Sequence, residues 1–134
     1  MANEAILVYE TATPIAFTCA DGIGIEKGAL LTLSDPMTVA TTAAKEDVIA
    51  GIAAQEKIAS DGKTKIAVYQ AGFFKMTCSG SVTAGDALIS GLGAGNIVET
   101  AGVGSEDILG IAQEDATTGQ TLLVKLQPMT LNLA

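Results

Sequence analysis

Two stretches of this chain, EDVIAGIAAQE at residues 46–56 and EDILGIAQE at residues 106–114, read as copies of one another. Similar segments flank both copies: EKGALLTL precedes and SDGKTKIAVYQ follows the first, whereas TAGDALIS precedes and TTGQTLLVKLQ follows the second. The glycines keep their order, with offsets of 57, 59 and 57 residues. They pair as Gly28 with Gly85, Gly51 with Gly110, and Gly62 with Gly119. The pattern indicates an internal duplication over about residues 24–70 and 82–127.

Two copies are too few for a solenoid, which needs about three stacked units. The duplication therefore predicts a pseudo-symmetric closed or nearly closed β structure, to which each copy supplies half. Glycine recurs along the chain with short apolar runs between, which is typical of a sandwich or barrel. The predicted strands are Ala5–Tyr9, Ile15–Thr18, Ala29–Leu33, Val48–Ala53, Thr64–Tyr69, Phe73–Cys78, Ala87–Ser90, Ile97–Thr100, Ile108–Ala112 and Gln120–Gln127.

One stretch favours a helix: TVATTAAKEDV, at residues 38–48, is rich in alanine but short. The expected fold class is therefore all-β with at most one or two short helices, in the form of a compact β-barrel or tulip-like domain. We expect residues 1–14 to form an extended N-terminal arm and residues 15–134 to form the β domain.

Composition excludes several classes of protein. The 134 residues are 49% hydrophobic and 16% charged, which predicts one ordered domain. Seven lysines and no arginine stand against fifteen acidic residues, for a net charge of −8, so we expect no nucleic-acid partner. No window approaches the roughly 18 apolar residues of a membrane-spanning helix. The amino terminus has no basic segment typical of a secretory signal.

Catalytic chemistry has little to build on, because the chain contains no histidine and so no Ser-His-Asp or Cys-His arrangement. The acidic pairs Glu46-Asp47 and Glu106-Asp107 could share acid/base work. They occupy equivalent positions of the duplication, however, and we interpret them as solvated turns that lead into strands. We expect no catalytic residue, no metal site and no cofactor.

Three further side chains could carry chemistry. Cys19 and Cys78 have 58 residues between them, which fits neither a redox pair nor a zinc knuckle, and we interpret them as buried free thiols, with a disulfide as the alternative. Lys75, between Phe74 and Met76, is similar to the carrier lysine of biotinyl and lipoyl domains. It falls inside a predicted strand, so a lysine on the outer face of that strand is the simpler interpretation.

The stretch Val48–Ser90 resembles the head decoration (capsid cement) proteins of tailed bacteriophages, which include the lambda-type family. The matching features are the strand Gly51-Ile52-Ala53, the strand Thr64–Tyr69, the QAGFF turn and the TAGDAL segment. A related group of phage capsid-stabilising proteins shows the same doubled layout of glycines and apolar residues, and this pattern covers about residues 24–127.

The resemblance implies a virion protein, made in the host cytoplasm, that sits as a homotrimer on local threefold axes of the capsid outer surface. There it would bridge subunits of the major capsid protein and stabilise the shell. No enzyme activity, membrane or nucleic acid belongs to that function. We expect Phe73 at the trimer contact, because Phe74, Met76 and Cys78 mark the inward face of their strand. The alternative is another β structural virion module, from a tail or spike.

The amino-terminal run EAILVYE is strongly β-prone and lies outside the duplication. An exposed apolar strand aggregates unless it has a partner, and strand addition supplies one through main-chain hydrogen bonds. In the decoration proteins the amino-terminal arm typically pairs with the capsid. We therefore expect the arm to add a strand to the capsid protein or to a neighbouring subunit through Ala5, Ile6, Leu7, Val8 and Tyr9.

Overall fold

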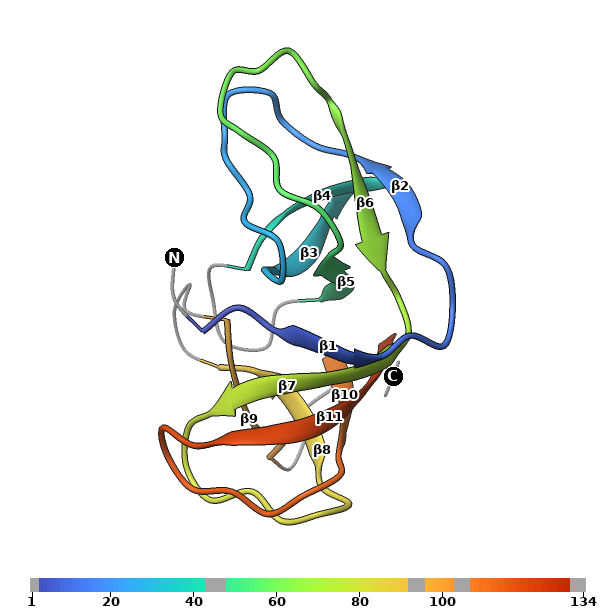
Figure 1. The fold of residues 1–134 in the computed structure, drawn as a ribbon. Helices are drawn as coiled ribbons and strands as arrows, with labels where there is room; N and C mark the ends of the chain where they lie inside the picture. Colours follow the sequence, from blue (N-terminus) through green and yellow to red (C-terminus); the bar gives the residue numbers. More distant parts are fainter. Residues whose placement is uncertain (1–2, 43–47, 92–95, 103–106, 131–134) are drawn as a thin grey trace.

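The computed structural model describes residues 3–42, 48–91, 96–102 and 107–130, and this part of the chain contains strands but no helix (Figure 1). The all-β prediction is confirmed. The strands are β1 (Ile6–Tyr9), β2 (Ile15–Thr18), β3 (Leu30–Asp35), β4 (Thr38–Thr41), β5 (Ile49–Ala53), β6 (Lys65–Tyr69), β7 (Gly72–Cys78), β8 (Ala87–Ser90), β9 (Ile97–Thr100), β10 (Asp107–Ala112) and β11 (Thr121–Thr130).

These strands form two closed barrels, one above the other in Figure 1. The first barrel joins β2, β4, β3, β5 and β6 in that order and closes on itself. The second barrel joins β7, β11, β10, β8 and β9, and it closes because β9 also pairs with β7. Strand β1 belongs to neither ring; it pairs with the first half of β7, on the edge whose last residues pair with β9, and lies at the junction between the barrels (Figure 1).

The two barrels have the same connectivity. The first strand of each pairs in parallel with the third, as β2 with β4 and β7 with β9, and every other pair within the two rings is antiparallel. Each copy of the duplication thus forms a complete barrel, whereas we expected each to supply half of one structure. The repeat also begins earlier than residues 24 and 82, because β2 and β7 precede the first matched glycine of each copy.

Buried apolar side chains form two clusters. One lies inside the first barrel and includes Phe17, Leu31 and Ile66. The other fills the second barrel and extends into the junction, where Leu30 and Ile52 of the first barrel join it. The backbone N–H of Leu30 also donates a 2.9 Å hydrogen bond to the buried Asn96 Oδ1. The barrels therefore share part of their core and are held against each other.

Residues 38–41 correct the helix prediction, since they form β4 and pair antiparallel with β3. Thr38, Val39 and Thr41 are β-branched, and Val39 is buried in the first barrel, so burial and strand pairing outweigh the helical preference of the alanines. Residues 43–47 of that stretch lie outside the described residues.

Gly51 and Gly110 occupy equivalent positions in β5 and β10, where a neighbouring strand comes unusually close. A Cβ atom on Gly51 would overlap the carbonyl oxygen of Tyr69, and one on Gly110 would overlap the carbonyl oxygen of Lys125. Of the three matched pairs of glycines, this one is therefore required by the close approach of neighbouring strands within each barrel.

Candidate interaction surfaces

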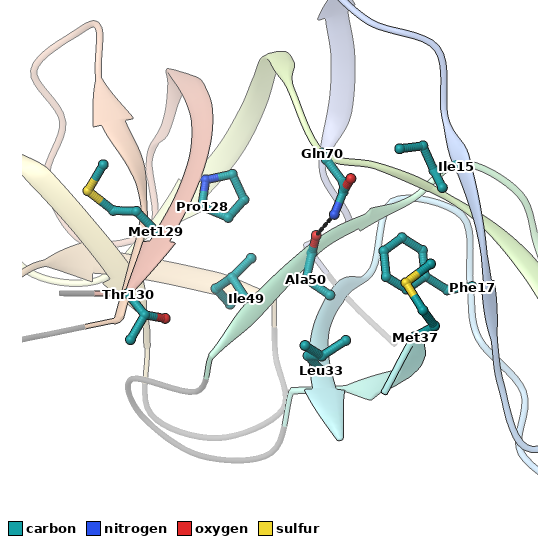
Figure 2. Close-up of a pocket in the computed structure, with 10 residues that line it drawn as sticks. All are labelled: Ile15, Phe17, Leu33, Met37, Ile49, Ala50, Gln70, Pro128, Met129 and Thr130. Atoms are coloured by element: carbon teal, nitrogen blue, oxygen red, sulfur yellow. Dashed lines mark hydrogen bonds between the residues drawn. The ribbon is translucent and has the colours of Figure 1, made fainter. Parts of the chain in front are cut away.

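A groove of about 670 Å³ opens between the two barrels (Figure 2). The first barrel supplies one wall from β2, β3, β5, the turn between β3 and β4, and the residue after β6, and the last residues of β11 supply the other. The lining residues are Ile15, Phe17, Leu33, Met37, Ile49, Ala50, Gln70, Pro128, Met129 and Thr130.

The groove is apolar and carries no charged side chain among its lining residues. Ile15, Leu33, Met37 and Met129 are each between 44% and 53% exposed, which is much for large hydrophobic side chains. Figure 2 shows two polar side chains among the lining residues, Thr130 and Gln70, and the amide of Gln70 donates to the carbonyl of Ala50 at 3.5 Å. Such a surface suits contact with another apolar surface better than it suits catalysis.

A second apolar surface lies on β1. This strand pairs antiparallel with β7, and its partner positions are Lys75, Phe74 and Phe73. Ile6 is 66% exposed, Val8 40% and Tyr9 61%; we call these three side chains the β1 ridge. Within the part of the chain that the structure describes, no strand pairs with the other edge of β1.

The predicted arm residues therefore fall into two groups. Ala5 is buried, Leu7 packs against the shared core, and the Ala5 N–H donates a 2.8 Å hydrogen bond to the Gly28 carbonyl of the first barrel. The three ridge residues face outward. In the isolated chain the segment is thus an edge strand that bridges both barrels, and its contact with a capsid protein or a neighbouring subunit stays a prediction.

Phe73, the predicted trimer contact, lies on β7 and is half-buried. Its ring packs edge-to-face on the exposed ring of Tyr9, with centroids 5.8 Å apart and an interplanar angle of 84°. Phe74 points the other way, into the core, as the sequence pattern predicted. Phe73 therefore packs against the β1 ridge through Tyr9. Its role in a trimer stays a prediction.

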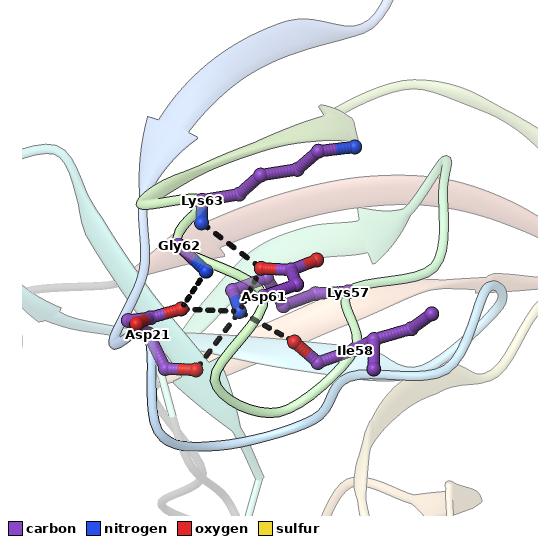
Figure 3. A network of polar contacts seen from close by, with 6 residues as sticks. All are labelled: Asp21, Lys57, Ile58, Asp61, Gly62 and Lys63. Carbon is purple, nitrogen blue, oxygen red and sulfur yellow. Dashed lines mark hydrogen bonds and ion pairs between the residues drawn. The ribbon is translucent and has the colours of Figure 1, made fainter.

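A buried lysine ties two loops together at the far end of the first barrel (Figure 3). The Nζ of Lys57 donates to the carbonyl oxygens of Asp21 (2.9 Å) and Ile58 (2.7 Å). It also pairs with the carboxylates of Asp21 (3.1 Å) and Asp61 (2.7 Å). The same carboxylates accept hydrogen bonds from the backbone N–H groups of Gly62 and Lys63. The ammonium is thus surrounded by oxygens, as a buried charge requires.

Burial by itself would lower the pKa of Lys57, but the hydrogen bonds and charges of Asp61 and Asp21 outweigh it and raise this pKa above its usual range. The hydrogen bond from Lys57 lowers the pKa of Asp61, and the backbone N–H of Lys63 adds to this effect. The second barrel has Ala116 in place of the lysine. The network therefore stabilises the loops of the first barrel alone. The sequence did not predict it, because a single lysine in a loop belongs to no recognisable motif.

The Lys57 network predicts how stability depends on pH. A carboxylate whose folded-state pKa is depressed stabilises the fold above its ordinary pKa of about 3.9, and this contribution is lost as the pH falls through the folded-state value. We expect Asp61→Asn to lower the free energy of unfolding at pH 7. Between pH 5 and pH 2 this free energy should fall less steeply with decreasing pH than in the parent, because the variant takes up fewer protons on unfolding, by up to about one. Urea unfolding of both proteins across this range measures the difference; parallel profiles would contradict it.

Lys75 lies in the middle of β7, and its Nζ is 3.0 Å from Oε1 of Glu114. Glu114 also accepts the backbone N–H of Leu123, and these two donors lower its pKa. Lys75 is thus an ion-paired lysine within a strand, which agrees with the simpler of the two interpretations, and it does not lie on an exposed turn as a carrier lysine does.

Cys19 and Cys78 are buried free thiols, as predicted, and burial raises the pKa of both.

Among the described residues, no group of three or more cysteine, aspartate and glutamate side chains could hold a metal ion. Of the two acidic pairs, Asp107 begins β10, whereas Glu46, Asp47 and Glu106 lie outside the described residues. The same ranges hold no helix with the length and apolar character to span a membrane.

Comparison with known proteins gives a likeness of fold. No protein-family model matches the chain, and neither does any curated protein sequence. Among solved structures, the chain is similar to the head fiber gp8.5 N base of bacteriophage phi29, with a TM-score of 0.57 and 16% sequence identity. The match covers 89% of this chain and 98% of that one. At this identity the likeness shows that the two chains share a fold over almost their whole length.

Proposed function

We propose that this protein is a structural component of a phage virion. It binds the outer surface of the capsid as a homotrimer at local threefold axes, bridges neighbouring subunits of the major capsid protein and so stabilises the shell. The observation that carries the proposal is the shared fold with a phage head fiber base over 89% of this chain and 98% of that one. The resemblance of Val48–Ser90 to head decoration proteins supports the same class of function.

The surfaces of the molecule suit such a role. Both barrels are closed, so the strands within them offer few free edges, and β1 is the edge strand of its sheet. The exposed apolar area gathers on the β1 ridge and in the interbarrel groove, where it is available to protein partners. A cement protein acts through contacts of this kind and needs no reactive group.

Virion composition tests this proposal. We expect quantitative gels of purified particles to show the protein at a copy number comparable with that of the major capsid protein, because every local threefold axis would carry three copies. Capsids that lack the protein should bind it when it is added back, and should then withstand higher temperatures before they release their genome. A few copies per particle would contradict decoration and favour a tail or spike component instead.

A further inference from the structure

We propose that the β1 ridge of one copy docks into the interbarrel groove of the next copy, so that the protein associates with itself head to tail. The choice of three copies rests on the proposed function, but the contact itself is inferred from the surfaces of the single chain. In this arrangement a second copy of this chain occupies the groove, for which the shared fold by itself suggests no occupant.

The distribution of exposed apolar side chains is the first argument. Ten large hydrophobic side chains are well exposed in the described part of the chain, and seven of them lie on the ridge or in the groove. The two surfaces share no residue. Exposure of either surface to water is unfavourable, and the ridge of one copy would bury the groove of the next. The seven are Ile6, Val8 and Tyr9 on the ridge, and Ile15, Leu33, Met37 and Met129 in the groove.

Charge is the second argument, because a second copy offers the groove an uncharged surface. Each copy carries a net charge of −8, so contact between charged parts of two copies is unfavourable. The ridge and the lining of the groove are both uncharged, so their contact sets no like charges against one another. The carboxylates of the arm, Glu4 and Glu10, flank the ridge in sequence and are not part of it.

Backbone conformation adds a third argument. The ridge is held in place by the pairing of β1 with β7, so little ordering is needed before it binds. In the groove, Met37 is held at a φ of +51°, a conformation that favours glycine, asparagine or aspartate, and its side chain is 53% exposed. A contact between copies would cover this large apolar side chain, which the single chain exposes to water at a strained position.

Because the ridge and the groove are different surfaces, the contact is heterologous, and repeated use of it gives either a closed ring or an open fibre. A ring of three copies would use every ridge and every groove, and it would leave no apolar surface of this kind exposed. That arrangement matches the threefold site of the proposed function.

The experiment compares three single variants of the full chain, each of which places one aspartate at an exposed apolar position. Ile6→Asp alters the ridge, Met37→Asp alters the groove in a conformation that aspartate tolerates, and Ile23→Asp is the control, because Ile23 is 59% exposed and belongs to neither surface. Sedimentation equilibrium should show self-association of the parent and of the control. For the ridge and groove variants, we expect the dissociation constant to rise about 30-fold or more.

Mixing supplies the sharper readout. Ile6→Asp keeps an intact groove and Met37→Asp keeps an intact ridge, so a mixture of the two should form a dimer of one copy of each, although each alone stays monomeric. A two-fold contact of identical surfaces would give no such rescue. Circular dichroism and thermal melting of each variant confirm that the barrels remain folded.

Several results would overturn the inference. The parent could be monomeric in solution, or could associate equally well in all three variants. Met37→Asp could leave self-association intact but abolish binding to capsids, which would assign the groove to the capsid protein and leave the proposed function standing. Met37→Asp and truncation after Thr130 could both destabilise the monomer without changing association, which would assign the groove to residues 131–134. A normal trimer that binds no capsid would instead contradict the proposed function alone.

Discussion

Replacing Gly51 with alanine is expected to destabilise the first barrel by about 3 kcal/mol or more, and Gly110→Ala should do the same to the second. The added methyl group would overlap a main-chain carbonyl oxygen of the neighbouring strand, that of Tyr69 or Lys125, and neither can move without opening its barrel. The total stability of a domain of this size is about 5–15 kcal/mol, so either variant should be close to unfolding at 37 °C.

Gly22→Ala is the matched control for these variants. Gly22 lies in an exposed turn, and a Cβ atom there would meet no atom within 4 Å. We expect its stability to lie within about 0.5 kcal/mol of the parent. Urea unfolding of the three variants gives the comparison, and a Gly51→Ala protein as stable as Gly22→Ala would show that the strands can separate at that point without cost.

Phe74→Ala is expected to cost about 3–5 kcal/mol, the usual range for removal of a fully buried phenylalanine. Phe74 is 1% exposed and belongs to the cluster that the barrels share, and its ring packs edge-to-face on Tyr69 of the first barrel at 5.5 Å. The substitution should therefore weaken the second barrel and also its attachment to the first, which would appear as a broader or a two-step unfolding transition.

The neighbouring phenylalanine provides the control. Phe73 lies on the opposite face of β7, half-buried, where its ring supports Tyr9. We expect Phe73→Ala to cost about 1 kcal/mol. Calorimetry of both variants tests the difference, and equal losses would mean that the two faces of β7 contribute alike and that Phe74 does not join the barrels.

The sequence predicted most of the strands because their signals are local. Short apolar runs bounded by glycine marked nearly all of them, and the matched glycines revealed the duplication. The two separate barrels were missed because strand pairing is non-local. Strand β2 pairs with β6 from about fifty residues away, and β7, which follows β6 directly in the chain, pairs with β11, β9 and β1 and not with β6. The helix prediction failed at β4 for the same reason, since pairing with β3 decides its conformation.

The interaction surfaces were predictable only in part. Strong β propensity marked the segment that became β1, but it could not show that Ala5 and Leu7 would be anchored in the chain's own core. The groove was invisible because it brings together residues from Ile15 to Thr130, and only the docking of the barrels creates it. The Lys57 network was hidden as well, because its oxygens come from two loops and from the main chain.

The buried thiols have a practical consequence. Cys19 follows β2 and Cys78 ends β7, so they occupy the same place in the two copies, and each is at most 2% exposed. Each barrel thus carries one buried cysteine thiol, which a thiol reagent reaches only when that barrel opens. The rates of labelling at the two sites under native conditions report whether the barrels open independently or as one cooperative unit.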